Sequence, residues 1–186
     1  MTPTPQPSDQ RPGDLVFCHS AGIVGKLIRL GQWLNRKTRS RGWYQENHVA
    51  VLDRWDPVAG DWTIIQAESR GVTDQAYLSS VTPNGNHRVV PLPSTVDRDA
   101  FVWFMRSQVG AHYGFLTIAS IAFNILTPSF VHVDFRHDTT WICSAVASGG
   151  LWFAGWRPIT IAPDLYSVTP AQLDQLINSA APGKGQ

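Results

Sequence analysis

The sequence predicts a single α+β domain. Three observations support this class: segments of strand character fill the first half of the chain, segments of helical character fill the second half, and a length of 186 residues suits one core. Hydrophobic residues make up 43% of the chain, a proportion typical of a packed globular domain. We expect the domain to span residues 13–179, with a disordered leader over residues 1–12 and a flexible tail over residues 180–186.

The first half of the chain combines several strands with one helix. Runs rich in β-branched and aromatic residues, bounded by Gly, Pro, Asn and Asp, predict the strands. Apolar residues that recur at spacings of four, three and four predict an amphipathic helix. Turn residues separate the second strand from the third, so we expect a hairpin. The expected elements are strands over residues 15–18, 48–52, 62–67 and 87–92, and a helix over residues 23–34.

The second half is mainly helical. Asp97 or Asp99 is expected to begin the first of these helices, and residues 115–126 form an apolar run that predicts a core helix. That run is shorter than the roughly 20 residues that cross a membrane, so no integral membrane segment is expected. Thr169 and Pro170 have the residue types of an N-cap and a first helical position. The apolar faces are predicted to consist of Phe101, Phe104, Met105 and Val109 in the earlier helix, and Leu173, Leu176 and Ile177 in the last one.

The charge balance excludes some partners. With 15 basic and 14 acidic residues the formal net charge is +1, so no global electrostatic attraction to nucleic acid or to an anionic membrane is expected. A basic cluster over residues 36–41 is interpreted as a solvated loop.

Residues 1–12 lack the basic start and the apolar core segment of a signal peptide. We therefore expect the protein in the cytoplasm, or at the cell wall by another route such as a phage particle.

Cys143 is the strongest candidate for a nucleophile. Asp138, Thr139 or Thr140 is expected to cap a helix that begins near Cys143 and ends at Gly149-Gly150. A thiol in the first helical turn lies near unpaired backbone N–H groups and the positive end of the helix dipole, which favour the thiolate. The sequence contains only two cysteines, so a disulfide-rich secreted domain is not expected.

His48 is the best candidate for the base. It begins a predicted strand on which Val49 and Val51 point to the opposite face. An imidazole held there by the strand is suited to accept the proton of the Cys143 thiol and later to protonate a leaving group.

Other pairings of reactive residues are weaker. Cys18 and His19 are neighbours on a strand, so their side chains point to opposite faces and cannot bond each other. A disulfide between Cys18 and Cys143 is left open. A cluster of His132, Asp134, His137 and Asp138 has metal-binding chemistry, but its spacing matches no zinc signature and we expect no cofactor.

The order of these segments resembles the circularly permuted NlpC-type cysteine peptidases, which include the YiiX-like proteins and have a papain-like fold. The histidine precedes the cysteine, as in the permuted group. The resemblance covers about residues 13–176. It rests on Gly13-Asp14-Leu15-Val16-Phe17, Asn47-His48-Val49-Ala50-Val51, Ile64-Ile65-Gln66-Ala67, Gly71-Val72, Trp141-Ile142-Cys143-Ser144 and Val168-Thr169-Pro170.

The resemblance implies a catalytic triad of Cys143, His48 and a third polar residue. In this group the third residue is commonly a glutamate followed by alanine, and the matching pair here is Gln66-Ala67. Gln66 is expected to accept a hydrogen bond from the imidazole and to fix its tautomer. Glu68 is the alternative, since it lies on the same face of the same predicted strand.

The resemblance further implies a cysteine hydrolase of the papain-like superfamily that cleaves an amide bond in a peptide substrate, the stem peptides of peptidoglycan being the expected class. Hydrolysis or transfer of acyl groups on lipids or thioesters is a second hypothesis. A non-catalytic binding or structural module that retains the fold is a third, which the glutamine at position 66 favours. The oxyanion is expected to face the backbone N–H of Cys143 and a second donor that the sequence does not identify.

Overall fold

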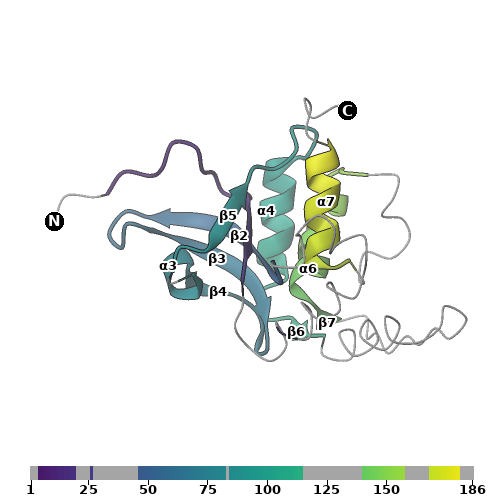
Figure 1. The fold of residues 1–186 in the computed structure, drawn as a ribbon, viewed down its shortest axis with the longest axis horizontal. Coiled ribbons are helices and arrows are strands. Elements are labelled where there is room, and N and C mark those ends of the chain that lie inside the picture. Colours follow the sequence, from purple (N-terminus) through teal and green to yellow (C-terminus); the bar gives the residue numbers. More distant parts are fainter. Residues whose placement is uncertain are drawn as a thin grey trace, which may run out of the picture.

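The chain forms an α+β domain, as predicted. A computed structural model describes residues 4–19, 26, 46–82, 84–114, 140–157 and 168–180. In these residues a five-stranded antiparallel sheet has the order β4-β3-β2-β1-β5, and a second, two-stranded sheet pairs β6 with β7 (Figure 1). The strands are β1 (Leu15–Cys18), β2 (His48–Asp56), β3 (Asp61–Glu68), β4 (Gly71–Tyr77), β5 (His87–Val90), β6 (His112–Tyr113) and β7 (Thr140–Trp141). The described helices are α3 (Leu78–Val81), α4 (Arg98–Ser107), α6 (Cys143–Phe153) and α7 (Pro170–Ala180).

The large sheet has two buried faces. Helices α4, α6 and α7 lie on one side of it and the short helix α3 lies near the other (Figure 1). Because side chains alternate along a strand, neighbouring residues of β2 belong to different clusters: Val49 and Val51 pack toward α6, whereas Ala50 and Leu52 pack with Leu78 of α3. Burial of both faces explains why the middle of β2 is continuously apolar.

The predicted hairpin of β2 and β3 is present, and both strands are longer than expected. Their paired residues run from Ala50–Gln66 to Asp56–Asp61, with a bulge between Leu52 and Arg54. Leader residue Thr4 lies against this hairpin, where its N–H donates to Pro57 at 3.0 Å. Strand β4, which pairs with β3, was not predicted, because its sequence Gly-Val-Thr-Asp-Gln-Ala-Tyr shows little apolar alternation.

Helix α6 departs from the sequence-based expectation at both ends. Its N-cap is Ile142, with no side-chain capping bond, so the prediction that Asp138, Thr139 or Thr140 caps the helix was wrong. The helix also continues through the two glycines that were expected to end it and stops at Phe153. Gly155, with a φ of +91°, provides the left-handed turn that follows the helix.

Gly150 is required where α6 crosses α4. A Cβ placed at this position would lie 2.7 Å from Cε2 of Phe101 and 3.1 Å from Cδ1 of Phe104. A hydrogen in place of a side chain therefore allows the two helices to approach, with Phe101 fully buried between them. The glycine inside α6 is a packing residue and not a helix stop.

Helices α4 and α7 begin as predicted. The carboxylate of Asp97 accepts from the N–H of Ala100 at 3.0 Å. In α7, the N–H of Thr169 donates to Oε1 of Gln172 at 2.8 Å, and the N–H of Gln172 donates to the Thr169 hydroxyl at 3.3 Å. This reciprocal pair is a capping box ahead of Pro170. Of the residues predicted for the two apolar faces, Phe101, Met105, Leu173 and Ile177 are buried and Phe104 and Leu176 are partly buried, but Val109 lies beyond α4 and is exposed.

Some predicted segments lie outside the described residues: the basic cluster over residues 36–41, the core helix over residues 115–126 and, apart from residue 26, the helix over residues 23–34.

We predict that Gly150→Ala lowers the free energy of unfolding by about 1–2 kcal/mol. The clash of a Cβ with Phe101 costs about 1–3 kcal/mol, which exceeds the gain of about 1 kcal/mol from alanine in a helix. Urea denaturation of the wild type and the variant measures the difference. Phe101→Leu removes the clashing ring, so Gly150→Ala should cost less in that background; an equal cost in both backgrounds would contradict the packing argument.

Candidate active site

The structure brings together the predicted residues His48, Gln66 and Cys143. His48 begins β2, and Gln66 lies opposite Ala50 on β3, so that alternation places the His48 and Gln66 side chains on the same face as diagonal neighbours. Nε2 of His48 lies 2.8 Å from Oε1 of Gln66. Since a carbonyl oxygen only accepts, Nε2 carries the proton of this bond. Nδ1 is left to face the thiol of Cys143, which is hydrogen-bonded to the His48 side chain.

The Cys143 sulfur reaches His48 at the point where β2 extends beyond its pairing with β3. The N–H of Leu52 bonds to Asp14 next to β1, so alternation directs the N–H of Val49 toward the β3 side. The paired residues of β2 and β3 begin only at Ala50–Gln66. The sulfur of Cys143 accepts the Val49 N–H in this gap. Helix α6 packs on one face of the sheet, whereas strand alternation assigns the His48 side chain to the other face. Cys143 contacts His48 at the edge where β2 is not paired with β3.

Two contacts fix the chain segment before His48. The guanidinium of Arg88 on β5 forms two hydrogen bonds with the carboxylate of Glu46, at 2.9 and 3.2 Å. The same guanidinium pairs with the buried carboxylate of Asp174 on α7 at 2.7 Å. The N–H of the buried residue Asn47 donates to the carbonyl of Cys18 at 3.2 Å. The strand that carries the histidine is therefore anchored both to its neighbours in the sheet and to a helix.

The site favours a thiolate and an imidazolium. Burial by itself would raise the pKa of Cys143, but the hydrogen bond and positive charge of His48, with the N–H groups of Val49 and Ser144, lower it below its usual value. Burial likewise would lower the pKa of His48, but its contacts with Cys143 and Gln66 and the charge of Glu68 raise it. The two shifts have opposite directions, and together they extend the pH range in which the ion pair exists.

Gln66 and Glu68, the two alternatives for the third residue, have different positions. Gln66 is only 3% exposed and makes the direct hydrogen bond to His48. Glu68 is exposed at the end of β3 and acts on His48 through its charge alone. Gln66 is thus the hydrogen-bond partner of the imidazole, and Glu68 is a source of negative charge that makes no direct bond to it.

Cys18 is a free, buried thiol beside the site. It lies directly opposite His48 in the pairing of β1 with β2. Burial, with the negative charges of Cys143 and Glu46, raises the pKa of Cys18 to about 12. Cys18 is therefore a thiol at neutral pH, and no disulfide joins it to Cys143 in this structure.

Tyr113 is a further aromatic residue beside the candidate site. It lies opposite Trp141 in the parallel pair of β6 and β7, two positions before Cys143, and packs against the core cluster that contains Cys143. Burial and then the negative charge of Cys143 raise the pKa of Tyr113, so its hydroxyl keeps its proton. Gly71 helps to set this position, because a Cβ there would collide with the carbonyl of Ala111. The spacing of Tyr113 from Cys143 gave no signal in the sequence.

The described residues offer no metal site. In the described part of the chain, no group of three His, Cys, Asp or Glu side chains is arranged to hold a metal ion, and the cluster of residues 132–138 lies outside that part.

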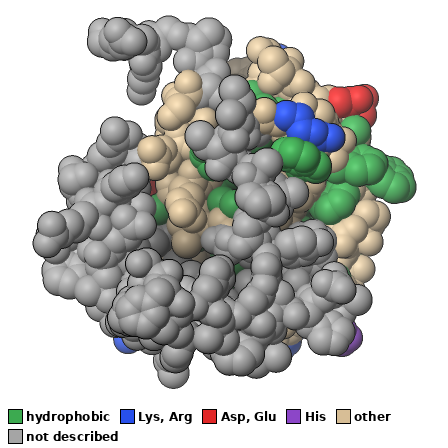
Figure 2. Space-filling model, turned by 90° about the vertical axis from the view of Figure 1, so that its right-hand side faces the viewer, with side chains coloured by type: hydrophobic (Ala, Val, Ile, Leu, Met, Phe, Trp, Pro, Cys, Tyr) green, Lys and Arg blue, Asp and Glu red, His purple; other side chains and the backbone are tan. Residues whose placement is uncertain are grey.

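Figure 2 shows hydrophobic side chains gathered on the surface beside basic and acidic ones. The exposed aromatic residues include Trp103 and Phe153, whose rings stack at 5.6 Å near the end of α6 that is remote from Cys143. Among the described helices, none has the length and apolar character needed to cross a bilayer.

Comparison of the sequence with protein-family models and with curated proteins gives no match.

We predict that iodoacetamide alkylates Cys143 rapidly below pH 7, because the thiolate persists below the usual pKa of a cysteine. His48→Ala should slow this reaction at least about tenfold by removing the charge and hydrogen bond that stabilise the thiolate. Mass-spectrometric mapping of the adduct at several pH values measures both rates. Cys18 provides an internal control that should stay unmodified. A Cys143 that reacts no faster than a free thiol would refute the ion pair.

We also predict that Gln66→Ala slows alkylation at pH 6 by roughly tenfold, the effect of one lost buried hydrogen bond. Gln66→Glu retains an acceptor and should preserve the rate. Glu68→Gln should change the rate by less than about threefold, and less at high salt, because the charge is exposed. Comparison of the three pH profiles assigns the orienting role; an unchanged Gln66→Ala profile would transfer it to Glu68.

Proposed function

We propose that the protein is a cysteine hydrolase that cleaves amide bonds, with a permuted papain-like arrangement of its domain. The observation that supports this proposal is the chain of hydrogen bonds from Cys143 at the start of α6, through His48, to Gln66. A nucleophile, a base and an orienting group in hydrogen-bond contact are the components of covalent acyl transfer. The strand histidine precedes the helix cysteine in the chain, which is the order of the permuted group that the sequence resembles.

The reaction would follow from the protonation states at the site. The thiolate of Cys143 attacks the amide carbonyl carbon and forms a tetrahedral intermediate. The imidazolium of His48 gives its Nδ1 proton to the leaving amine as the carbon–nitrogen bond breaks, which leaves a thioester on Cys143. Neutral His48 then removes a proton from water, which attacks the thioester and releases the carboxylate. The bond from Nε2–H to Gln66 keeps the ring in one orientation through both steps.

The oxyanion would be stabilised by two donors. One is the backbone N–H of Cys143 at the start of α6, where the helix dipole adds to the effect. The hydroxyl of Tyr113 is the second candidate, since it lies in the same cluster and keeps its proton beside the thiolate. This assignment supplies the donor that the sequence alone did not identify.

The proposed substrate class is the stem peptide of peptidoglycan, which follows from the family resemblance. Acyl groups on lipids or thioesters are the second candidate, because their cleavage requires the same nucleophile and base. Delivery by a phage particle, or action inside the cell, belongs to the proposal as well.

We predict that the protein releases soluble fragments from purified peptidoglycan and that Cys143→Ala abolishes the release, because the variant has no nucleophile. Chromatography and mass spectrometry of the fragments identify the bond that is cleaved. In parallel, acyl-thioester and phospholipid substrates test the second candidate. If wild-type Cys143 is reactive but only the lipid or thioester substrates are cleaved, peptidoglycan is the wrong substrate. If no substrate is cleaved and Cys143 is unreactive, the protein is not a hydrolase.

Tyr113→Phe is the matched variant for this experiment. It removes only a hydroxyl, so the alkylation rate of Cys143 should stay close to that of the wild type. Turnover should fall by about 10²–10³, the usual effect of one lost oxyanion donor. Unchanged turnover would exclude Tyr113 as that donor.

A further inference from the structure

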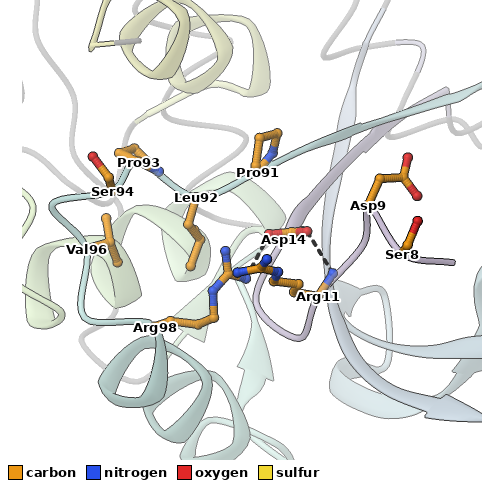
Figure 3. Close-up of a pocket in the computed structure, with 10 residues that line it drawn as sticks. All are labelled: Ser8, Asp9, Arg11, Asp14, Pro91, Leu92, Pro93, Ser94, Val96 and Arg98. Atoms are coloured by element: carbon orange, nitrogen blue, oxygen red, sulfur yellow. Dashed lines mark hydrogen bonds and ion pairs between the residues drawn. The ribbon is translucent and has the colours of Figure 1, made fainter. Parts of the chain in front are cut away.

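A separate pocket lies at the other end of β1 from the candidate active site. Its volume is about 460 Å³, within the usual range for sites that hold small molecules. The segment before β1 forms one wall and the connection from β5 to α4 forms the other (Figure 3). The catalytic candidates adjoin Cys18 at the end of β1, whereas the pocket adjoins Asp14 at its beginning. The lining comprises Ser8, Asp9, Arg11, Asp14, Pro91, Leu92, Pro93, Ser94, Val96 and Arg98.

The pocket contains two guanidinium groups beside one carboxylate that is already satisfied. Asp14 is 1% exposed; its Oδ1 accepts from Nη1 of Arg98 at 2.8 Å, and its Oδ2 accepts from the backbone N–H of Arg11 at 2.9 Å. The Nη1 group also donates to the carbonyl of Pro12 at 2.6 Å. Arg98 is therefore held in place by two protein acceptors before any ligand binds.

Several donors remain for a ligand. Within the described residues, the Arg11 side chain makes no hydrogen bond or ion pair, and Nε and Nη2 of Arg98 have no acceptor. Both guanidinium groups point toward Asp14, while Asp9, the other carboxylate of the lining, extends away from them (Figure 3). One positive charge thus lacks a nearby counterion, in the planar geometry that matches a carboxylate.

The opposite wall is apolar. Leu92 and Val96 are buried core residues whose side chains reach the pocket, and Pro91 and Pro93 flank them. A ligand that fits both walls has an anionic end and an apolar end. We infer that this pocket binds a small organic carboxylate, with the carboxylate on Arg11 and Arg98 and an aliphatic portion against Leu92 and Val96. The inference is independent of the proposed hydrolase activity.

Isothermal titration calorimetry of the full chain with isovalerate, acetate and inorganic phosphate tests this inference at low salt. We expect saturable binding of isovalerate, about tenfold tighter than acetate because of its additional apolar carbons. Tighter binding of phosphate than of isovalerate would overturn the assignment of an apolar carboxylate. Absence of saturable binding of isovalerate would overturn the site itself.

Two variants locate the binding. Arg11→Gln removes an exposed charge that supports no other contact in the described structure, and it should weaken isovalerate binding about tenfold or more. Arg70→Gln makes the same charge change at an exposed turn between β3 and β4 and should leave the affinity within about twofold. Equal effects of the two variants, or no effect of Arg11→Gln, would show that the ligand binds elsewhere. Circular dichroism confirms that each variant is folded.

Discussion

The candidate active site depends on one backbone group, the N–H of Val49. In a continuous sheet this donor would bond to the neighbouring strand, but β2 extends beyond its pairing with β3 and leaves the donor for the Cys143 sulfur. A buried N–H without an acceptor would be costly, so the sulfur of Cys143 also satisfies a backbone donor of the sheet. The unpaired end of β2 and the start of α6 are therefore joined by this contact between Val49 and Cys143.

The neutral residue at position 66 has a physical explanation. A buried ion pair is stable only when hydrogen bonds replace the lost water, and here Val49, Ser144 and Gln66 supply them. Gln66, which is 3% exposed, offers an acceptor to His48 without adding a buried charge of its own. Glu68 raises the pKa of His48 from an exposed position, where its own charge stays hydrated. Gln66 thus supplies the hydrogen bond to His48, and Glu68 supplies a negative charge.

Rigid packing behind the site supports this arrangement. Gly150 lets α6 pack closely on α4 with Phe101 between them. The Ser144 hydroxyl donates to the carbonyl of Val168 at 2.5 Å and links the first turn of α6 to the start of α7. Arg88 in turn ties α7 to the segment before His48 through Asp174 and Glu46. Cys143 and His48 are thus held by the same helices and strands, which keeps their side chains in contact.

Local sequence patterns sufficed to predict the α+β class, most strands and the starts of α4 and α7, and they singled out Cys143, His48 and Gln66 as a candidate site, because strand alternation, helix caps and short motifs are local properties. The N-cap and the end predicted for α6 were both wrong. The end was wrong because local rules treat glycine as a stop, whereas the close approach of α4 requires a glycine at position 150. The tertiary structure was needed to show that Gln66 bonds His48 whereas Glu68 does not, that Tyr113 packs against the cluster of Cys143, and that Arg11 and Arg98 line one pocket. Each of these depends on segments distant in the chain, whose meeting is set by strand register and helix packing and leaves no trace in residue spacing.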